Sequence, residues 1–252
     1  MPTIQQLSNY CAQYLKIQDF RDYCPNGLQV EGRTEVKKLA TGVTASLSFI
    51  EQALEWGADA LLVHHGYFWK NEDVTITGIK KRRLQRLLAQ DVSLLAYHLP
   101  LDAHAEVGNN ACLAAMLGID DLEPLQAGVR RSVGNVGTLA EDIDVNTFVT
   151  RCQQALGRDV LHINSGAATI RRIALCTGGA QAMIDDAIRV QADLYLTGEI
   201  SEQTVHIARE AGIHFIAAGH HATERYGAQA LGRHLEQEFN LIHRFFDIDN
   251  PA

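Results

Sequence analysis

Short apolar segments rich in β-forming residues alternate along this chain with longer segments of helical periodicity. The strands expected on this pattern are Lys38–Val43, Ala60–Val63, Ser93–Tyr97, Asn135–Leu139, Val160–Ile163, Arg172–Cys176, Leu194–Thr197 and Ile213–Ala217. The helices expected are Ile4–Lys16, Leu47–Trp56, Ile79–Gln90, Asn109–Leu117, Asn146–Ala155, Ala180–Val190, Glu202–Glu210 and Tyr226–Glu238. This alternation predicts α/β layers rather than a sandwich or a helix bundle.

An internal repeat is visible within this alternation. Residues 37–65 align without gaps on residues 171–199, an offset of 134, and six of the 29 pairs are identical. Both copies read basic pair, strand, helix, Ala-Asp, strand. The next strand aligns at an offset of 122, so the first copy carries 134 − 122 = 12 extra residues, around Glu72–Arg83. The pattern indicates two related α/β halves, although two α/β units can also resemble each other by chance.

Composition excludes several classes of function. The formal net charge is −8. An acid excess disfavours binding to nucleic acid or to an anionic membrane, because both need dense Lys and Arg. No apolar run of 18 residues exists and the first residues lack a signal-peptide pattern, so we expect no membrane span. The five cysteines are widely spaced and form no CxxC pair, which is typical of reduced thiols in a cytoplasmic protein.

The first candidate cluster is His64-His65-Gly66, at the end of a buried-type strand. Ligands of α/β sheets bind at the carboxyl ends of strands. Neighbouring residues of a strand point in opposite directions, so both rings reach one site only if the backbone turns, which Gly66 permits. The two rings would then serve two metal ions. The alternative is one packed and one solvated histidine.

The second cluster is His98-Leu-Pro-Leu-Asp102, expected as a loop because Pro100 disfavours a continuing helix. Asp102 is a hard oxygen ligand, and His98 is a nitrogen ligand or a proton carrier. Asp102 can instead be an N-cap or a turn former.

The third cluster is Gly219-His220-His-Ala-Thr-Glu224. In a helix that begins near His220, this residue and Glu224 share one face. A glutamate can bridge two metal ions, although an ordinary ion pair on a helix face has the same spacing. The repeat places His98 on His220 and Asp102 on Glu224. Together the three clusters favour a metal site.

Glu199 aligns with His65 in the repeat, so it is expected to face the same cleft. It is a candidate outer-shell acid or general base, and a solvated glutamate is the alternative. The sequence has no GxxxxGK[ST] phosphate loop, no GxGxxG and no GxSxG nucleophile elbow.

These motifs, taken in order, resemble the dinuclear-metal family known as GTP cyclohydrolase 1 type 2 homologues, also called the Ngg1-interacting-factor-three-like family. The resemblance includes Pro25-Asn-Gly-Leu-Gln-Val and Gly108-Asn-Asn and covers nearly the whole chain. It is greatest to the short enterobacterial type, which also has Gly-Tyr-Phe-Trp after the histidine pair. Many other members have Pro where this chain has Gly66.

The resemblance implies a set of ligands for two divalent ions, with Glu224 as the bridge: His64, His65, Asp102, His220 and Glu224. It places His98 beside them as a ligand or an outer-shell group. His/carboxylate ligands without thiolate allow Zn, Fe, Mn, Co or Ni.

The resemblance also implies two interlinked α/β units with mixed sheets and a ring-shaped homohexamer with sites facing an inner cavity. We expect a first unit at residues 1–125, with residues 213–252 packing back on it, and a second unit at residues 126–212. The stretch Asp120–Arg131 is the least regular part of the chain and the expected crossing between them.

Two hypotheses of function follow. In the first, the chain is a metal-dependent hydrolase that directs water at a purine-type ring or an amide-like bond of a small molecule, with Glu199 or His98 carrying protons. In the second, it is a non-enzymatic metal-binding ring that acts through partners or regulation. The aromatic run Tyr67–Trp69 would line a substrate pocket in the first case and a subunit or partner surface in the second.

Overall fold

The computed structural model describes residues 1–129 and 131–252. By internal contacts the chain divides into two compact units, which the chain enters alternately. Unit 1 is Met1–Leu101 with Gly227–Asp249, and unit 2 is Asp102–Tyr226 with Asn250–Ala252. Two α/β units, interlinked in this way, confirm the predicted fold class. The bounds differ from the predicted division at 125 and 212.

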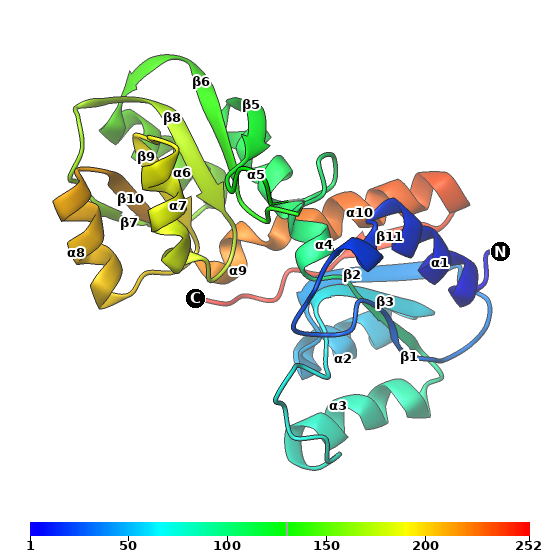
Figure 1. Ribbon diagram of the computed structural model, residues 1–252. Helices are drawn as coiled ribbons and strands as arrows, with labels where there is room; N and C mark the ends of the chain where they lie inside the picture. Colours follow the sequence, from blue (N-terminus) through cyan, green and yellow to red (C-terminus); the bar gives the residue numbers. More distant parts are fainter. Residues whose placement is uncertain (130) are drawn as a thin grey trace. The chain divides into compact units, whose positions relative to one another are not determined.

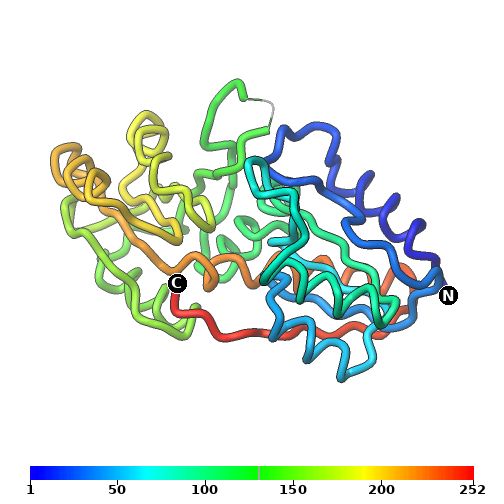
Figure 2. Tube along the Cα trace, turned by 90° about the horizontal axis from the view of Figure 1, so that it is seen from below, coloured from blue at the N-terminus to red at the C-terminus, as the bar shows by residue number. Residues whose placement is uncertain are grey.

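Unit 1 is built on one mixed sheet with the strand order β1-β4-β3-β2-β11 in the described residues. Neighbouring strands in this sheet are parallel, except that β1 is antiparallel to β4. Figure 2 shows the last strand, in red, beside the light-blue β2. The elements are α1 (Ile4–Tyr14), η1 (Ile17–Asp19), β1 (Gly27–Val30), β2 (Lys38–Thr44), α2 (Leu47–Trp56), β3 (Ala60–His65), α3 (Gly78–Ala89), β4 (Ser93–Ala96), α4 (Leu99–Asp102), α10 (Arg225–Phe239) and β11 (Ile242–Phe245). Helix α4 ends on Asp102, the first residue of unit 2. Helix α10 begins on Arg225 and Tyr226, the last two residues of the longer segment of unit 2.

Unit 2 carries a mixed sheet with the order β5-β6-β8-β9-β10-β7 in the described residues (Figure 1). Strands β8, β9 and β10 are parallel, and the outer strands pair antiparallel. Its elements are α5 (Asn109–Leu117), β5 (Ile119–Pro124), β6 (Asn135–Asp144), α6 (Val145–Leu156), β7 (Leu161–Ile163), β8 (Thr169–Cys176), η2 (Gln181–Met183), α7 (Ile184–Arg189), β9 (Leu194–Thr197), α8 (Glu202–Ala211), β10 (His214–Ala217) and α9 (His220–Thr223).

Both faces of the unit 2 sheet are buried. Ile173 and Leu175 of β8 pack in one apolar cluster with α5 and α6, whereas the alternating residues Ala174 and Cys176 pack in another with α7 and α8. A sheet covered on both faces has apolar side chains at every position, which explains the unbroken apolar runs in the sequence.

The unit bounds differ from the predicted ones because of strand pairing. The stretch Asp120–Arg131, expected to be irregular, contains most of β5, which pairs with β6 inside unit 2. Residue 130 lies outside the described residues. At the other end, β10 pairs with β7 and β9 and so belongs to unit 2, and only the chain from Gly227 to Asp249 returns to unit 1.

Strand register confirms the internal repeat. Leu39 pairs with Ala60 in unit 1, and Ile173 pairs with Leu194 in unit 2, so both strands keep the offset 173 − 39 = 194 − 60 = 134. The third strand differs from the prediction by one residue. Ser93 and His214 occupy the equivalent places, which gives an offset of 121, and the first copy carries 134 − 121 = 13 extra residues. One additional residue between β10 and His220 restores the offset of 122 at the histidines.

The Ala-Asp pair in each copy has the same structural role. One carboxylate oxygen of Asp59 accepts hydrogen bonds from the backbone N–H groups of residues 37 and 38, both at 2.9 Å. The carboxylate of Asp193 accepts from residues 171 and 172, both at 2.8 Å. Each aspartate thereby holds the start of the preceding repeat strand next to its own strand.

We therefore expect Asp59→Ala and Asp193→Ala to lower the free energy of unfolding by similar amounts, about 1–3 kcal/mol each, because a charged acceptor of two backbone N–H groups is lost. Denaturant titration measures this loss. The exposed Asp249 is the control, and Asp249→Ala should change little. A loss at only one of the two repeat positions would contradict equivalent roles.

Among the described residues, no helix combines the length and the apolar character required to cross a lipid bilayer.

Candidate metal centre

His64 and His65 are the last two residues of β3. The ring of His64 is fully buried, and its Nδ1 lies 2.9 Å from the carbonyl oxygen of Tyr97. A carbonyl only accepts, so the proton of a neutral His64 is on Nδ1 and its lone pair is on Nε2. The Nδ1 of His65 lies 3.1 Å from the Thr44 hydroxyl, and the two ring centroids are 4.6 Å apart. Both rings are thus anchored through Nδ1, the arrangement in which Nε2 would be the nitrogen that binds a metal ion.

Gly66 is required at this point for space. A Cβ on residue 66 would overlap the Gln29 side chain and approach Ala96 Cβ to 2.6 Å. The side-chain oxygen of Gln29 accepts from the backbone N–H of Tyr67 at 2.7 Å, which fixes the loop after β3. Gly66 is therefore needed because side chains approach it closely, whereas the left-handed backbone in this loop is at Phe68, with φ 65°, and Asn71, with φ 71°.

His98 follows β4 and directly precedes α4. The segment 98–102, predicted as a loop, contains a short helix, because Pro100 stands in the first turn, where its missing N–H has no helical partner to lose. The backbone N–H of His98 donates to Asn26 Oδ1 at 2.7 Å, and its Nδ1 lies 2.7 Å from Asp22 Oδ1.

Unit 1 brings three imidazoles together. One ring nitrogen from each of His64, His65 and His98 lies within 4.8 Å of the others. The indole of Trp69 packs edge-on against His98, with a centroid separation of 5.0 Å. Imidazole clusters of this kind bind Zn, Fe, Co, Ni or Mn. Unit 1 therefore contains a set of residues capable of holding a metal ion.

Asp22 and Cys24 also lie within 4.8 Å of a His98 nitrogen, but their chemistry does not suit a metal. Burial, followed by the charge of Asp22, raises the pKa of the Cys24 thiol to about 12. A protonated thiol is a poor ligand. The two oxygens of Asp22 accept four hydrogen bonds, from the backbone of Tyr23 and Leu99 and from the side chains of Asn26 and His98.

Unit 2 contains Asp102, the first of the two carboxylates predicted as metal ligands. This residue is 4% exposed. Its Oδ1 accepts from the Asn109 amide at 2.8 Å and from the Thr177 hydroxyl at 3.3 Å. The neighbouring Asn110 accepts from the backbone N–H of Thr177 and donates to the Val133 carbonyl. The Gly108-Asn-Asn motif thus serves to fix Asp102 and the loop after β8.

Glu224, His220 and Glu199 form a chain of contacts in unit 2. Helix α9 begins at His220, and Nε2 of this residue lies 3.2 Å from Glu224 Oε2. The Nδ1 of His220 lies 2.7 Å from Glu199 Oε1. The hydrogen bond to Glu224 outweighs burial and, together with Glu199, raises the pKa of His220 to about 9. The predicted i,i+4 contact is present, and Glu199, whose side chain is 46% exposed, contacts the opposite nitrogen of the same ring.

Asp102 and Glu224 act on the same buried group. Burial raises the pKa of the Cys176 thiol well above its usual range, and the charges of Asp102 and Glu224 raise it further. Both carboxylates are therefore close enough to the end of β8 for their fields to overlap.

Gly178 lies against Glu224. Its φ is +71°, and a Cβ there would overlap Glu224 Oε1 and come within 3.2 Å of His220 Nε2. The Gly178 carbonyl accepts from the backbone N–H of Gly198 at 2.8 Å, which ties the loop to the next strand end. Glycine is thus needed both for the backbone conformation and for the space that the carboxylate occupies.

We expect Gly178→Ala to displace Glu224 and to reduce metal binding. Gly157→Ala is the matched control, because Gly157 has φ +69° and an added Cβ would meet nothing within 4 Å. In both variants, backbone strain should lower the free energy of unfolding by about 1–2 kcal/mol, which denaturant titration measures. Only Gly178→Ala should lose metal in elemental analysis. Equal metal contents would show that the Glu224 position does not matter.

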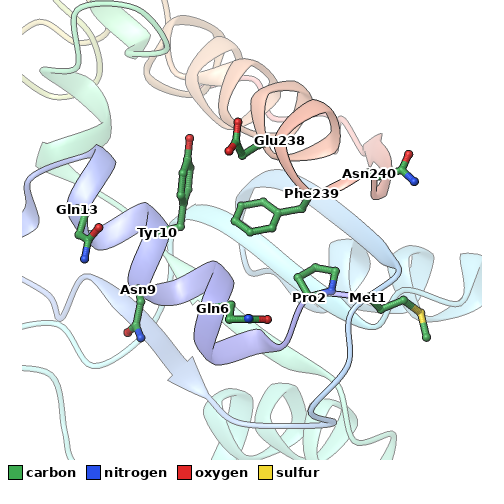
Figure 3. Close-up of a pocket in the computed structure, with 9 residues that line it drawn as sticks. All are labelled: Met1, Pro2, Gln6, Asn9, Tyr10, Gln13, Glu238, Phe239 and Asn240. Atoms are coloured by element: carbon green, nitrogen blue, oxygen red, sulfur yellow. The ribbon is translucent and has the colours of Figure 1, made fainter.

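Among the described residues, each unit has a hollow at its surface. One of about 620 Å³ in unit 2 is lined in part by Arg158, Leu161, Glu199 and Ile200, and so includes a predicted catalytic residue. The other, of about 700 Å³ in unit 1, lies between α1 and the end of α10 and has Tyr10 and Phe239 in its wall (Figure 3). None of its lining residues is a predicted site residue, so only the first hollow bears on the chemistry.

The family can now be assigned. The family model described as Duf34/NIF3 (NGG1p interacting factor 3) matches residues 2–251. The chain belongs to the NIF3 family. This confirms the predicted family.

Curated relatives of this NIF3-family chain carry the name GTP cyclohydrolase 1 type 2 homolog. One from Pseudomonas aeruginosa is 56% identical over 240 residues, 95% of each chain. One from Escherichia coli (strain K12) is 49% identical over 235 residues, 92% of each chain. The solved structure of protein ybgI, described as of unknown function, has a TM-score of 0.95 and 46% identity, covering 99% of this chain and all of that one. These similarities agree with the fold described above.

The aromatic run after the histidine pair is placed differently from its prediction. Tyr67 belongs to the core of unit 1 and its hydroxyl donates to the Ala45 carbonyl at 2.7 Å. Trp69 packs against His98, and Phe68 is 39% exposed with the Lys80 ammonium 5.1 Å from its ring centroid. In this NIF3-family chain Tyr67 is therefore a core residue, Trp69 lies beside a candidate site residue, and Phe68 faces outward.

Sequence reasoning missed two residues that hold the site residues in place. Asp22 anchors His98, and Asn109 anchors Asp102. Asn109 lies in a motif already noted for the family, whereas Asp22 precedes the Pro25-Asn-Gly motif and carries no local signal of its own. Its contact with His98 joins residues that are 76 positions apart.

Proposed function

We propose that this chain binds two divalent metal ions and is a metal-dependent hydrolase that cleaves a C–N bond in a purine-type ring or an amide-like group. The observation that carries the proposal is a shared arrangement of the three imidazoles among the proposed ligands. His64, His65 and His220 each have Nδ1 next to a protein oxygen, at 2.7–3.1 Å. Such anchoring orients Nε2 toward a ligand and raises its basicity.

The proposed ligands are those that the family resemblance implies. His64, His65, Asp102, His220 and Glu224 would hold the ions, and Glu224 would contribute to both. The donor chemistry fits borderline divalent metals, because it combines neutral imidazole with buried carboxylate. At His220 the metal would replace the proton on Nε2, while Nδ1–H stays with Glu199.

Bound divalent ions supply Lewis-acid activation of water near neutral pH. The chain's own residues supply proton handling and substrate binding. Glu199 holds the proton on Nδ1 of His220, and its partly exposed carboxylate also lines the hollow of about 620 Å³. That hollow has the size of a small-molecule site and combines apolar walls with a few polar groups.

The test begins with protein purified without added metal. Elemental analysis should give about two ions per chain after incubation with Zn, Fe, Mn, Co or Ni, followed by removal of excess. A hydrolysis screen over nucleotides and cyclic amides, beginning with GTP, then identifies the substrate class. Protein that stays metal-free under these conditions would refute the metal site, and metal-loaded protein that hydrolyses nothing in the screen would refute the hydrolase.

A non-enzymatic metal-binding protein is the second candidate, and one observation favours it. The extra segment of the first repeat copy exposes apolar side chains: Val74 at 87%, Ile76 at 57% and, at the start of α3, Ile79 at 59%. Exposed apolar groups in one short segment are typical of an interaction surface. Full metal occupancy without turnover would support this candidate.

We also propose that the chain assembles as a homohexamer, as the family resemblance implies. The expected mass is 6 × 27.8 kDa, about 167 kDa, in light scattering at dilute concentration. If the exposed segment is in a subunit contact, Val74→Ser with Ile76→Ser should lower that mass. A wild-type mass close to that of a single chain would contradict the assembly.

A further inference from the structure

His98 and His220 occupy equivalent positions of the internal repeat, and each is paired with a carboxylate. The distance from Nδ1 to the carboxylate oxygen is 2.7 Å in both cases. The carboxylates are not equivalent in sequence. Glu199 lies in the second copy, whereas Asp22 precedes the first copy altogether. The same carboxylate–imidazole pair is therefore built twice from unrelated segments, which points to a shared requirement rather than to inheritance from one ancestral unit.

Asp22 is held rigidly for this role. Its side chain is 3% exposed, and both of its oxygens are engaged. Oδ1 accepts from the backbone N–H of Tyr23 at 2.6 Å as well as from His98, and Oδ2 accepts from Leu99 N at 3.0 Å and from the Asn26 amide at 2.8 Å. Burial raises the pKa of Asp22, but the hydrogen bond and charge of His98, with Asn26 and Tyr23, outweigh it and lower the pKa. The carboxylate is thus ionised and can only accept.

The same contacts fix the ring of His98. Its backbone N–H donates to Asn26, and its ring packs against Trp69 in a T-shaped arrangement with an interplanar angle of 86°. With Nδ1 directed at Asp22, the nitrogen on the opposite side of the ring is Nε2. The centroid of the His98 ring lies 5.0 Å from that of His64 and 5.7 Å from that of His65. The carboxylate keeps the His98 proton on Nδ1, because an acceptor there excludes the other neutral tautomer.

We propose that Asp22 is a positioning residue that holds His98 as the Nδ1–H tautomer, so that His98 Nε2 is a proton acceptor beside the metal ligands and is not itself a ligand. The inference deepens the proposed hydrolase. A water or substrate O–H bond breaks, its proton bonds to Nε2, and its electron pair stays on oxygen. The resulting imidazolium keeps its Nδ1–H bond to Asp22, whose negative charge stabilises it.

The direct test is the tautomer of His98 in the metal-free protein. Long-range ¹H–¹⁵N correlation spectra of protein labelled with ¹⁵N-histidine distinguish the two neutral forms, and a His98→Gln sample assigns the signal. We expect Nδ1–H in the wild type. In Asp22→Asn, the new NH₂ must face a donor that the carboxylate accepted, and His98 can relieve the conflict by moving its proton to Nε2. The Nε2–H form should therefore become populated.

The control is Asp73→Asn, the same change at an exposed aspartate of unit 1 that accepts from Thr75 N. It should leave the His98 signal unchanged. A wild-type protein with the proton on Nε2, or an Asp22→Asn protein with an unaltered tautomer, would overturn the proposal. This result needs neither metal nor substrate, so it stands apart from the hydrolase proposal.

Metal content and turnover separate the role of acceptor from that of ligand. Asp22→Asn should keep both ions within about twofold of the wild-type affinity. If the hydrolysis screen yields a substrate, kcat should fall on the order of 10²-fold with KM little changed. Loss of metal by tenfold or more in Asp22→Asn would make His98 a ligand oriented by Asp22 and would refute the proton acceptor.

Discussion

Replacing Glu224 by glutamine should remove at least one of the two proposed ions from each chain. The side chain is 3% exposed and contacts His220, and the proposed bridge touches both ions. A bridging carboxylate offsets the repulsion of two dications, and neutral imidazoles cannot do so. Glutamine keeps the size of the side chain, so the loss is electrostatic. We expect the affinity for the lost ion to fall on the order of 10²-fold or more, measured by titration calorimetry and elemental analysis.

Two variants make this measurement specific. Glu202→Gln removes a charge from a side chain that is 92% exposed and pairs with the exposed His206, so it should keep both ions. His98→Ala should also spare most of the metal if this residue is a proton acceptor. If Glu224→Gln retains both ions at wild-type affinity while His98→Ala loses them, the bridge is assigned to the wrong residue.

The strands and helices of the internal repeat could be predicted from the local pattern of apolar and polar residues. Strand β9 has the predicted bounds, and β2, β3 and β8 overlap theirs, because each contains a run of at least four consecutive buried residues. Strand β5 was missed because it is an exposed edge of the sheet, with the acidic sequence IDDLEP and only its first residue buried. Strand β11 was missed for a related reason, since its I-H-R-F pattern is short and has no buried residue.

The candidate site shows the same division. Histidines at strand ends can be predicted, because parallel strands end at one edge of a sheet and a His-His pair there has few structural uses. The carboxylate that orients a ring cannot be predicted in this way. Asp22 reaches His98 across 76 positions, and nothing in its own neighbours distinguishes it from a turn residue. Fixing a tautomer is a tertiary property, and it becomes visible only when the acceptor and the ring nitrogen are both placed.

Removing divalent metal from the protein should lower its thermal stability. Asp102 and Glu224 are both buried in unit 2, and both act on the Cys176 thiol. Two carboxylates in one low-dielectric region repel each other, and a dication between them would reverse that energy. Binding to the native state alone stabilises it by about 2.7 kcal/mol at a free metal concentration 100 times Kd. The midpoint of thermal unfolding should therefore rise with added metal and fall with a chelator.

The double variant Asp102→Asn with Glu224→Gln separates this effect from nonspecific binding. It removes both negative charges and keeps both shapes, so its midpoint should be nearly the same with metal and with chelator. Calorimetry on the wild type and the double variant, each in the two conditions, measures the difference. If the wild-type midpoint is also insensitive to the chelator after metal loading, the carboxylates of unit 2 are not metal ligands. In that case their burial must be stabilised by the amide and hydroxyl donors of Asn109 and Thr177 and by His220.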